Sequence, residues 1–389
     1  MTSSLPAPSA AASAHCSLVA SHLRDTIAAA GGWLPFDRFM ELALYAPGLG
    51  YYSAGLHKFG GSGDFVTAPE MSALFGQTLA RQAAQILDLT GGDILEIGAG
   101  SGRLALDLLR ELEMLGRLPA HYLILDVSAD LRQRQRQLLE EQVPQLVSRV
   151  VWLDALPTAF SGLILGNEAL DAMPVHMLAW RGADLFERGV TWRDGAFHWS
   201  ERKLTEGELF ERAAQLPPAR AANTEEYLSE IALAAFGFVA TLAERLERGA
   251  MLFIDYGFGE SEYYHPQRRL GTLMCHYRHH AHDDPFYLPG LQDITAHVDF
   301  SAIAQQGVAH GLRLLGYTTQ ANFLLNSGLT EILARVSPAD AGAYLPLAAQ
   351  AQKLLSPAEM GELFKVIALG KGIDPPLQGF ARGDKSYLL

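Results

Sequence analysis

Cysteine is scarce in this sequence of 389 residues, which contains only Cys16 and Cys275. Two cysteines cannot build a disulfide framework, and by themselves they cannot supply a zinc cluster. A reducing compartment is therefore the simplest setting for the chain. The sequence also lacks any apolar run of about 18 residues or more, so we expect no membrane-spanning helix and no membrane partner.

The N-terminal segment has little charge of either sign. Residues 1–15 are rich in Ser, Ala and Pro, and no Arg precedes Arg24. They lack the basic and apolar regions of a secretory signal and the arginines of a mitochondrial transit peptide. We therefore expect residues 1–15 to form a disordered tail on a cytoplasmic protein.

Basic charge is under-represented as well, since 43 acidic residues against 30 Lys and Arg give a formal net charge of −13. This surplus disfavours binding to phosphate backbones, so we expect no nucleic-acid partner. It suits a cationic ligand or a basic target, although an acidic surface also serves solubility alone. The remaining composition, 49% apolar and 19% charged, is that of a globular protein with one large core or a core plus a smaller unit.

From Gly92 onward, short apolar runs alternate with segments of helical spacing. We predict strands at residues 93–97, 122–125, 150–153, 163–165, 251–254, 317–321 and 365–369. We predict helices at residues 104–115, 131–142 and 225–248, the last stopped by Gly249. This alternation predicts an α/β fold with a Rossmann-like, mostly parallel sheet covered by helices on both faces.

Three stretches fall outside the alternation. Residues 16–90 begin with helical spacing and form an N-terminal cap, and residues 176–223 contain an alternating meander followed by a linker. Residues 257–300 are rich in His, Tyr, Asp and Pro without clear periodicity, which is typical of a lid or substrate loop. The core then comprises residues 91–175, 224–256 and 301–370, and a C-terminal tail occupies residues 371–389.

The most informative segment is the glycine loop after the first predicted strand. Glu96 lies at the end of that strand, and Gly98, Gly100 and Gly102 follow it. Glycines at such a place let the backbone turn into a helix and approach a ligand closely. A dinucleotide fingerprint would place its third glycine at position 103, which is Arg103 here. The preceding acid can instead face a cationic amino-acid moiety, which predicts S-adenosylmethionine as the cofactor.

Two further acids lie at the ends of the next strands. Asp126 can accept hydrogen bonds from both ribose hydroxyls, and it or Ser128 can also cap the helix that follows. Asp154 is similarly placed for the adenine amino group, with a turn residue as the alternative.

A third group of cofactor candidates precedes the core. Thr67, Pro69 and Glu70 can form a wall over the methionine end of the cofactor. They equally fit a capped helix start, with Thr67 as the N-cap and Glu70 three positions later.

Several stretches of the chain go beyond a generic fold. They are, in order, residues 45–52 (YAPGLGYY), 63–70 (GDFVTAPE), 167–174 (NEALDAMP), 255–257 (DYG), 290–300 (GLQDITAHVDF) and 360–366 (MGELFKV). Together they resemble the MidA-like family of S-adenosylmethionine-dependent methyltransferases, which includes the mitochondrial methyltransferase that acts as a complex I assembly factor. One departure is Asp126, where the family more often carries Glu; either carboxylate can hold a ribose.

The resemblance implies a class I methyltransferase fold with a seven-stranded sheet and, for the mitochondrial members, protein-arginine methylation. It does not imply that bacterial-looking members share that substrate. As partners we expect a protein substrate, which by resemblance alone would be a respiratory-complex subunit, and we allow for a homodimer.

The candidate acceptor site follows the fourth predicted strand, where α/β sheets place ligands. Asn167 is assigned to the cofactor, and Glu168 and Asp171 are the candidate catalytic carboxylates. An arginine acceptor is charged at any physiological pH, so carboxylates must hold it and align one nitrogen. The alternative is a polar loop in which Asp171 is a helix cap or a turn residue.

Histidines are concentrated in the 257–300 segment. His297 is a further catalytic candidate, and with Asp299 it either contacts substrate or braces its neighbour. A metal hypothesis would use His276, His279, His280, His282, Asp283 and Asp284. One short segment without paired cysteines is a poor zinc framework, so we expect no metal.

Three functions remain in competition. The first is an S-adenosylmethionine-dependent protein methyltransferase that acts on arginine. The second is a small-molecule methyltransferase of the same fold, and the third is an assembly protein that binds the cofactor without turnover. A fold alone does not decide among them.

Overall fold

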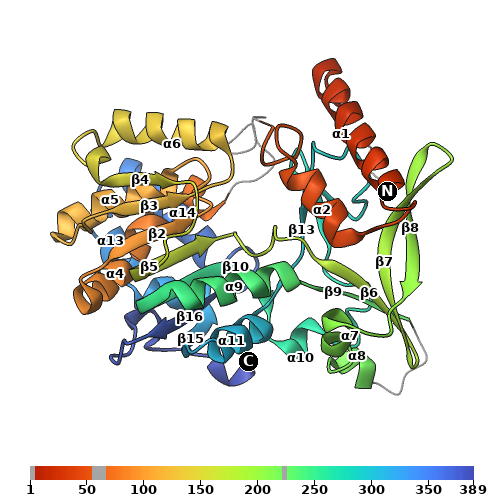
Figure 1. The fold of residues 1–389 in the computed structure, drawn as a ribbon. Coiled ribbons are helices and arrows are strands. Elements are labelled where there is room, and N and C mark those ends of the chain that lie inside the picture. The colour runs from red at the N-terminus through yellow and green to blue at the C-terminus, as the bar shows by residue number, and fades with distance from the viewer. Residues whose placement is uncertain (1–4, 55–66, 221–225) are drawn as a thin grey trace.

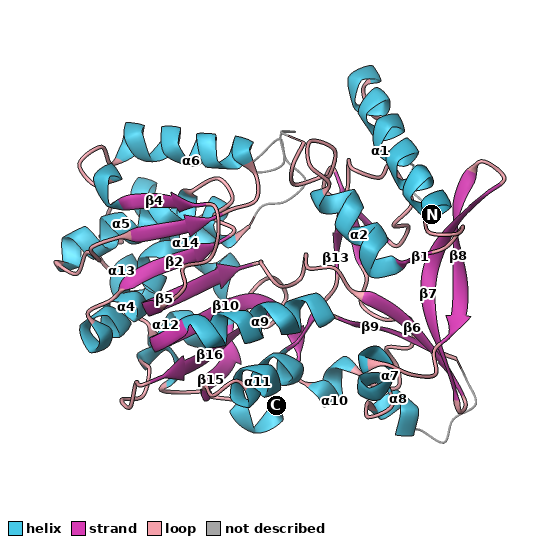
Figure 2. Cartoon of the chain, viewed as in Figure 1, coloured by secondary structure: helices cyan, strands magenta, loops and turns pink. Residues whose placement is uncertain are grey.

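The computed structural model describes residues 5–54, 67–220 and 226–389. The chain forms two parts side by side (Figures 1 and 2): a core part, with a large sheet covered by helices, and a smaller part, built from the N-terminal helices and the inserted strands. Within the described ranges, no helix combines the length and the apolar character needed to cross a membrane. Residues 63–66 of the 63–70 stretch lie outside those ranges.

The large sheet has a path of seven strands. In spatial order they are β15 (Arg313–Thr319), β16 (Phe364–Lys371), β10 (Leu246–Phe258), β5 (Phe160–Asn167), β2 (Asp93–Ile97), β3 (Tyr122–Leu125) and β4 (Val150–Leu153). β10, β5, β2, β3 and β4 are parallel, whereas β16 is antiparallel to both of its neighbours. The short β14 (Val298–Asp299) pairs with β10 off this path. The chain runs from β2 outward to β4 and returns to β5, so the strand order reverses between β2 and β5.

Helices cover both faces of the large sheet. The first face carries α4 (Ala73–Thr90), α5 (Arg103–Leu115), α6 (Ala129–Gln142), α12 (Gln320–Asn326), α13 (Leu329–Leu333) and α14 (Ala341–Leu355), and the second carries α9 (Leu233–Arg245) and α11 (Phe300–Ala309). The side chains of β10 show why helices are needed on both faces of the sheet. Leu252 and Ile254 belong to the apolar cluster of the first face and Met251 and Phe253 to that of the second, because side chains alternate along a strand.

The smaller part contains two further sheets. The first sheet has the strand order β1 (Leu34–Pro35), β7 (Asp184–Arg193), β6 (His176–Arg181) and β9 (Tyr227–Ile231), and β8 (Ala196–Lys203) also pairs with β7. The second sheet has the strand order β12 (His280–His282), β11 (Met274–Tyr277) and β13 (Asp293–Thr295). Helices α1 (Ala10–Ala29) and α2 (Phe36–Tyr45) share one apolar cluster with both sheets, through Leu23, Phe39, Val190, Cys275 and Ile294 among others.

The remaining elements are short. They are α3 (Ala68–Met71), α7 (Glu208–Ala213), α8 (Pro217–Arg220), α10 (Glu260–Tyr263) and the 3-10 turns η1 (Val147–Arg149), η2 (Gln378–Phe380) and η3 (Ser386–Leu388).

The predicted disordered tail at residues 1–15 is wrong from Ala10 onward. The Ser9 side chain caps α1 by accepting a hydrogen bond from the Ala12 N–H at 3.2 Å. The helix then buries Val19, Leu23 and Ile27 against the smaller part. The Ser- and Ala-rich composition of this segment is therefore compatible with the N-terminus of a helix.

The predicted helix at residues 225–248 is wrong at both ends. Tyr227–Ile231 is strand β9, and β10 begins at Leu246; residue 225 lies outside the described ranges. Gly249 is inside β10 rather than at a helix end. A Cβ on Gly249 would lie 1.9 Å from the carbonyl oxygen of Gly162, so glycine permits close pairing with β5.

Two segments that we expected to lack regular elements are built into the fold. The 257–300 segment contributes β11 to β14, with Cys275 and Phe300 buried. The predicted tail at 371–389 packs Leu377 and Phe380 into the first-face cluster. The strand predicted at 317–321 ends at Thr319, because that side chain caps α12.

Candidate active site

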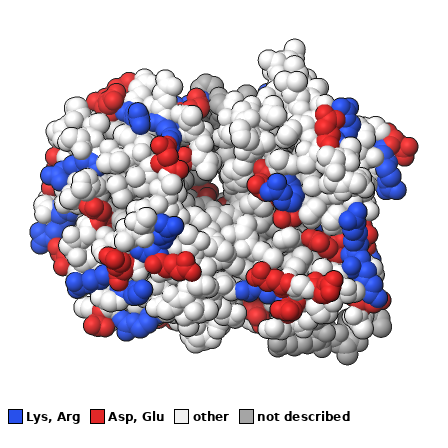
Figure 3. Space-filling view, viewed as in Figure 1, with Lys and Arg blue, Asp and Glu red and all other residues white. Residues whose placement is uncertain are grey.

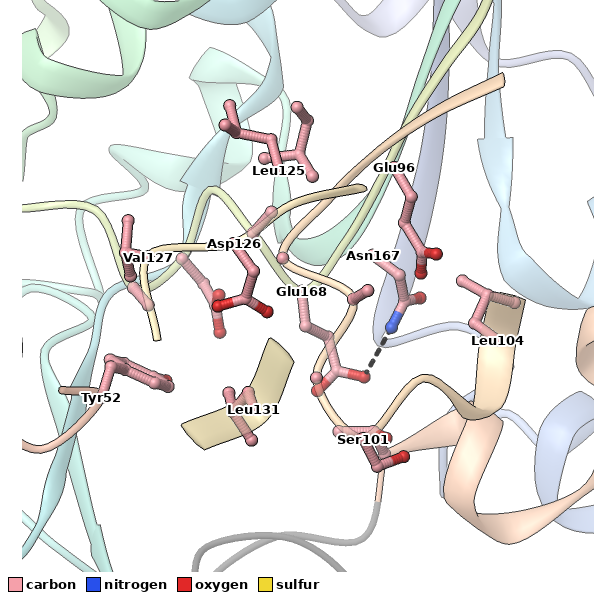
Figure 4. A pocket seen from close by; sticks show the side chains of 18 of the residues that line it. Tyr52, Glu96, Ser101, Leu104, Leu125, Asp126, Val127, Leu131, Asn167 and Glu168 are labelled. Atoms are coloured by element: carbon pink, nitrogen blue, oxygen red, sulfur yellow. Dashed lines mark hydrogen bonds between the residues drawn. The ribbon is translucent and has the colours of Figure 1, made fainter. Parts of the chain in front are cut away.

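A cavity of about 330 Å³ lies at the carboxyl ends of β2, β3 and β5, next to the point where the strand order reverses. Its lining comes from both parts of the molecule: the loops after those three strands, the turn of α3, the end of α2 and β13. Figure 3 shows the surface hollowed between the two parts, with acidic side chains at the bottom. Figure 4 shows the cavity from close by.

The glycine loop forms one wall of this cavity. Gly98, Gly100 and Gly102 have φ angles of 67°, 54° and 86°, a left-handed conformation that favours glycine. A Cβ on Gly98 would meet no atom within 4 Å, so the space in front of this backbone is open to a ligand. Gly98 and Gly100 line the cavity, whereas Gly102 does not. Gly102 instead begins α5, and a Cβ there would lie 3.2 Å from Gln135.

Glu96 lines the cavity from the end of β2 and is only 2% exposed. The Tyr122 hydroxyl, from β3, donates a hydrogen bond to its Oε2 at 2.7 Å. The pKa of Glu96 is raised to about 7, mainly by burial and in part by the nearby Asp126 carboxylate, while the hydrogen bond from Tyr122 acts in the opposite direction. A cation brought to Glu96 would favour its charged form.

Asp126 lines the cavity from the end of β3. The Ser128 N–H and the Gln135 amide donate to its two oxygens, each at 2.9 Å, so the carboxylate has a fixed orientation. The helix cap of α6 is Ser128, which accepts from the Leu131 N–H. Capping therefore does not account for Asp126, which is consistent with a ligand role.

Asp154 does not reach the cavity. Its side chain is 92% exposed and pairs with Arg132, Oδ1 to Nη1, at 2.7 Å. The adenine role predicted for Asp154 is therefore not supported, because this side chain faces solvent and is absent from the cavity lining.

Thr67, Pro69 and Glu70 all line the cavity around α3. Thr67 occupies the N-cap position of α3, but its side chain makes no capping hydrogen bond. Glu70 accepts a hydrogen bond from the Ser101 hydroxyl of the glycine loop. The three residues thus border the glycine loop, and the predicted capping-box bonds are not formed.

Glu168 follows β5 with a backbone φ of 51°, an unusual conformation for a residue other than glycine. Its N–H donates to the Ile254 carbonyl at 2.9 Å, which holds the loop against β10. The Asn167 amide donates to Glu168 Oε1 at 3.2 Å, the dashed line in Figure 4. Burial raises the pKa of Glu168 to about 8, and the Asp171 charge adds to the shift. Strained backbone and a displaced pKa are both common at functional sites.

Asn167 and Asp171 complete this loop. Asp255 Oδ2, from β10, accepts the N–H groups of Leu170 and Asp171 at 2.9 and 3.3 Å and fixes the turn. Burial raises the pKa of Asp171 well above its usual value, and the Asp255 and Asp293 charges add to the effect. Among the described residues, no donor reaches Asn167 Oδ1, although this oxygen is buried.

Three further lining residues, Tyr45, Tyr52 and Asp293, were not predicted as site residues. The Tyr45 hydroxyl donates to the Ala172 carbonyl at 2.9 Å, and the Tyr52 hydroxyl donates to Asp293 Oδ2 at 2.8 Å. All three fall within the stretches 45–52 and 290–300. That placement was the only available signal, because these stretches lie far from the glycine loop in the sequence.

His297 does not line the cavity. Its ring stacks on Phe258 with centroids 5.3 Å apart and planes 4° from parallel. Burial lowers the pKa of His297 to about 4, and Arg268 lowers it further. Asp299 caps α11 by accepting the Ala302 N–H at 3.1 Å. The structure thus gives these two residues packing and capping roles, and the predicted catalytic role of His297 is not supported.

Metal-ligating side chains come together at one place within the described ranges, at Asp37, His176 and Glu187 in the smaller part. Within the same described ranges, the histidines of β11 and β12 are not part of any group of metal-ligating side chains. In the observed arrangement His176 Nδ1 lies 2.9 Å from Glu187 Oε1, which is a hydrogen bond between β6 and β7.

Residues 78–318, more than half of the chain, match the family model of S-adenosyl-L-methionine-dependent methyltransferases. The chain belongs to this family. Its cofactor is accordingly S-adenosylmethionine.

Relatives of this methyltransferase cover nearly the whole chain. A Drosophila melanogaster protein named mitochondrial protein arginine methyltransferase NDUFAF7 homolog is 30% identical over 94% of this chain and 88% of its own length. The human protein arginine methyltransferase NDUFAF7 is 27% identical over 87% and 80%. A crystal structure of a COG1565 superfamily member from Burkholderia thailandensis, bound to S-adenosyl-homocysteine, is 54% identical, covers 99% of this chain and 100% of its own, and has a TM-score of 0.95.

The cavity of this methyltransferase suits the chemistry of that cofactor. S-adenosylmethionine presents a sulfonium, an ammonium and two ribose hydroxyls, and the lining offers the carboxylates of Glu96 and Asp126 together with the open backbone at Gly98. Buried acids are stabilised by hydrogen-bond donors and by cations, and such a ligand supplies both.

Proposed function

We propose that this methyltransferase acts on arginine side chains of protein substrates. The observation that carries the proposal is the pair of carboxylates on the cavity wall after β5, the half-buried Glu168 and the buried Asp171. Among the residues that the structure describes, no arginine, lysine or histidine forms an ion pair with either. An ionised carboxylate that is buried without a counter-charge, such as that of Asp171, is costly, so a cationic acceptor is a suitable partner.

The cofactor would lie against the glycine loop. Glu96 and the backbone of Gly98 and Gly100 would hold its amino-acid moiety, Asp126 would accept from its ribose, and α3 would close one side. When bound, it supplies an activated methyl group. The transfer depends mainly on orientation and on exclusion of water, which a buried and pre-formed lining provides.

Glu168 would hold the guanidinium and orient the nitrogen that accepts the methyl group. That nitrogen would form a bond to the methyl carbon as the bond from this carbon to the sulfonium sulfur breaks, which leaves S-adenosylhomocysteine. The nitrogen must also lose one proton for the methylated guanidinium to keep a single positive charge. The Glu168 carboxylate is a suitable acceptor for this proton, because burial raises its pKa to about 8. Asp171, fixed by Asp255, would share the contact or maintain the loop.

The names of the relatives support this acceptor class, since the Drosophila and human proteins are protein arginine methyltransferases. A respiratory-complex subunit as the substrate, a homodimer and a cytoplasmic location stay predictions from the sequence.

The proposal is tested by methyl transfer from tritium-labelled S-adenosylmethionine into an extract of cells that lack this protein. After acid hydrolysis the label should elute as methylarginine. Glu168→Gln should lower the rate by about a hundredfold while the affinity for S-adenosylhomocysteine stays within about twofold, because the substitution removes only the charge that aligns the acceptor.

Glu359→Gln, at an exposed glutamate far along the chain, is the matched control and should leave the rate unchanged. Label in small molecules, or in lysine or carboxyl groups of proteins, would contradict arginine methylation. A Glu168→Gln rate near that of the wild type would remove Glu168 from the acceptor site.

A further inference from the structure

Asp293 lines the cavity although it belongs to β13, in the three-stranded sheet of the smaller part. It is buried. Burial raises the pKa values of Glu168, Asp171 and Tyr45, and the charge of Asp293 raises each of them further. Asp293 is therefore close enough to the acceptor end to act on it electrostatically.

Both oxygens of Asp293 are oriented by neighbouring donors. The Tyr52 hydroxyl donates to Oδ2 at 2.8 Å, and the Ile294 N–H donates to Oδ1 at 3.0 Å. These bonds give the carboxylate a fixed orientation, and a carboxylate offers about four acceptor positions in all. A carboxylate fixed in this way is ready to receive donors from a ligand.

Tyr52 is itself positioned by the acceptor loop. Its ring stacks on Tyr45, with centroids 5.4 Å apart, and the Tyr45 hydroxyl donates to the Ala172 carbonyl. The Ala296 N–H, just beyond β13, donates to the Asp171 carbonyl at 2.9 Å. In the view of Figure 4, Glu168 and Asp126 lie between Tyr52 at one side and Glu96 at the other. The contacts thus tie β13 to the loop that carries Glu168 and Asp171.

We propose that Asp293, oriented by the Tyr52 hydroxyl, is a second carboxylate that binds the guanidinium together with Glu168 and so selects arginine as the acceptor. The inference rests on the proposed arginine methylation. A guanidinium presents five N–H donors in a planar fork, which carboxylates on two separate elements can hold in one orientation. Asp293 contacts the substrate, and Tyr52 is a positioning residue.

The test measures initial rates of labelled methyl transfer over a range of extract concentrations. Asp293→Asn should raise the extract concentration that gives half-maximal rate by about tenfold or more, because a charge-assisted contact is lost. Tyr52→Phe keeps the carboxylate but frees its orientation, so a smaller increase of about threefold is expected. Both variants should bind S-adenosylhomocysteine within about twofold of the wild type, as measured by calorimetry.

Matched controls exist outside the cavity. Asp299→Asn neutralises a half-buried carboxylate that does not line the cavity, and Tyr263→Phe removes a buried hydroxyl that donates to Glu230 at 3.3 Å. Each removes the same chemical group as its counterpart from a place outside the cavity, and neither should change the half-maximal extract concentration.

The outcomes separate the inference from the proposed function. Wild-type label outside methylarginine would overturn both. Label in methylarginine with unchanged concentration dependence in Asp293→Asn and Tyr52→Phe would overturn the role of Asp293 alone. If Asp293→Asn fails to bind S-adenosylhomocysteine, Tyr52→Phe decides, and a parallel loss of cofactor affinity in that variant would assign the pair a structural role instead.

Discussion

Glu168 combines a left-handed backbone, burial and a position at the end of a parallel strand. Each of these features costs stability, and the Ile254 carbonyl and the Asn167 amide offset only part of the cost. The surrounding acids add to it, since burial raises the pKa values of Asp171 and Asp255 as well. A site that holds so much carboxylate at one place is less stable empty than filled with a cation.

This electrostatic strain predicts a pH dependence of the cofactor-free protein. Above about pH 4.5 the unfolded chain loses the Glu168 proton, whereas the folded protein keeps it up to about pH 8. The folded protein therefore binds more protons in this window, and its free energy of unfolding should fall as pH rises from about 5 to 8. Thermal melting should show a shallower decline for Glu168→Gln than for the wild type.

Glu96, Asp255 and Asp299, whose pKa values are raised to about 7, contribute to the wild-type decline, so only the difference between the two slopes reports on Glu168. Identical slopes would mean that Glu168 is ionised in the empty site at neutral pH.

At the level of single residues, the sequence was informative where a motif and a strand end coincide. Glu96, Asp126 and Glu168 all line the cavity as predicted. Asp154 follows the same rule, but its side chain faces solvent. His297 was suggested by its neighbours, and only the fold shows that its ring packs on Phe258. Asp293 could not be assigned, because no local pattern indicates that β13 reaches the cavity.

Among the elements, the buried parallel strands were predicted best. β3 and β4 match the predicted bounds of 122–125 and 150–153, since short apolar runs between helices have few other interpretations. The region after residue 225 was predicted worst. Tyr227–Ile231 has helical spacing with the residues that follow, and its pairing with β6 is a tertiary effect that local periodicity does not carry.

The 257–300 segment provides a test at the scale of elements. β11 pairs with β12 on one side and β13 on the other, and Cys275 and Tyr277 are buried. We therefore expect the amides of Met274–Tyr277 to exchange slowly in the cofactor-free protein. Hydrogen exchange followed by mass spectrometry measures this directly. Complete exchange of β11 within seconds, slowed by cofactor, would favour the lid predicted from the sequence.

At the scale of the molecule, the cavity is shared between two parts. The core part supplies the glycine loop and the Glu168 loop, and the smaller part supplies Tyr45, Tyr52 and Asp293. The glycine loop of the cavity therefore belongs to the large sheet, while the wall opposite it includes residues from the smaller part. This division explains why the residues of the glycine loop were predictable from one motif, whereas Tyr45, Tyr52 and Asp293 were not.

The most direct test of the account is a crystal structure of this methyltransferase with S-adenosylhomocysteine and an arginine peptide that becomes labelled in the extract experiment. The account predicts the guanidinium in the cavity between the two parts, with its nitrogens about 3 Å from carboxylate oxygens of Glu168 and Asp293. S-adenosylhomocysteine on the glycine loop with the guanidinium bound elsewhere, or directed away from both carboxylates, would contradict it.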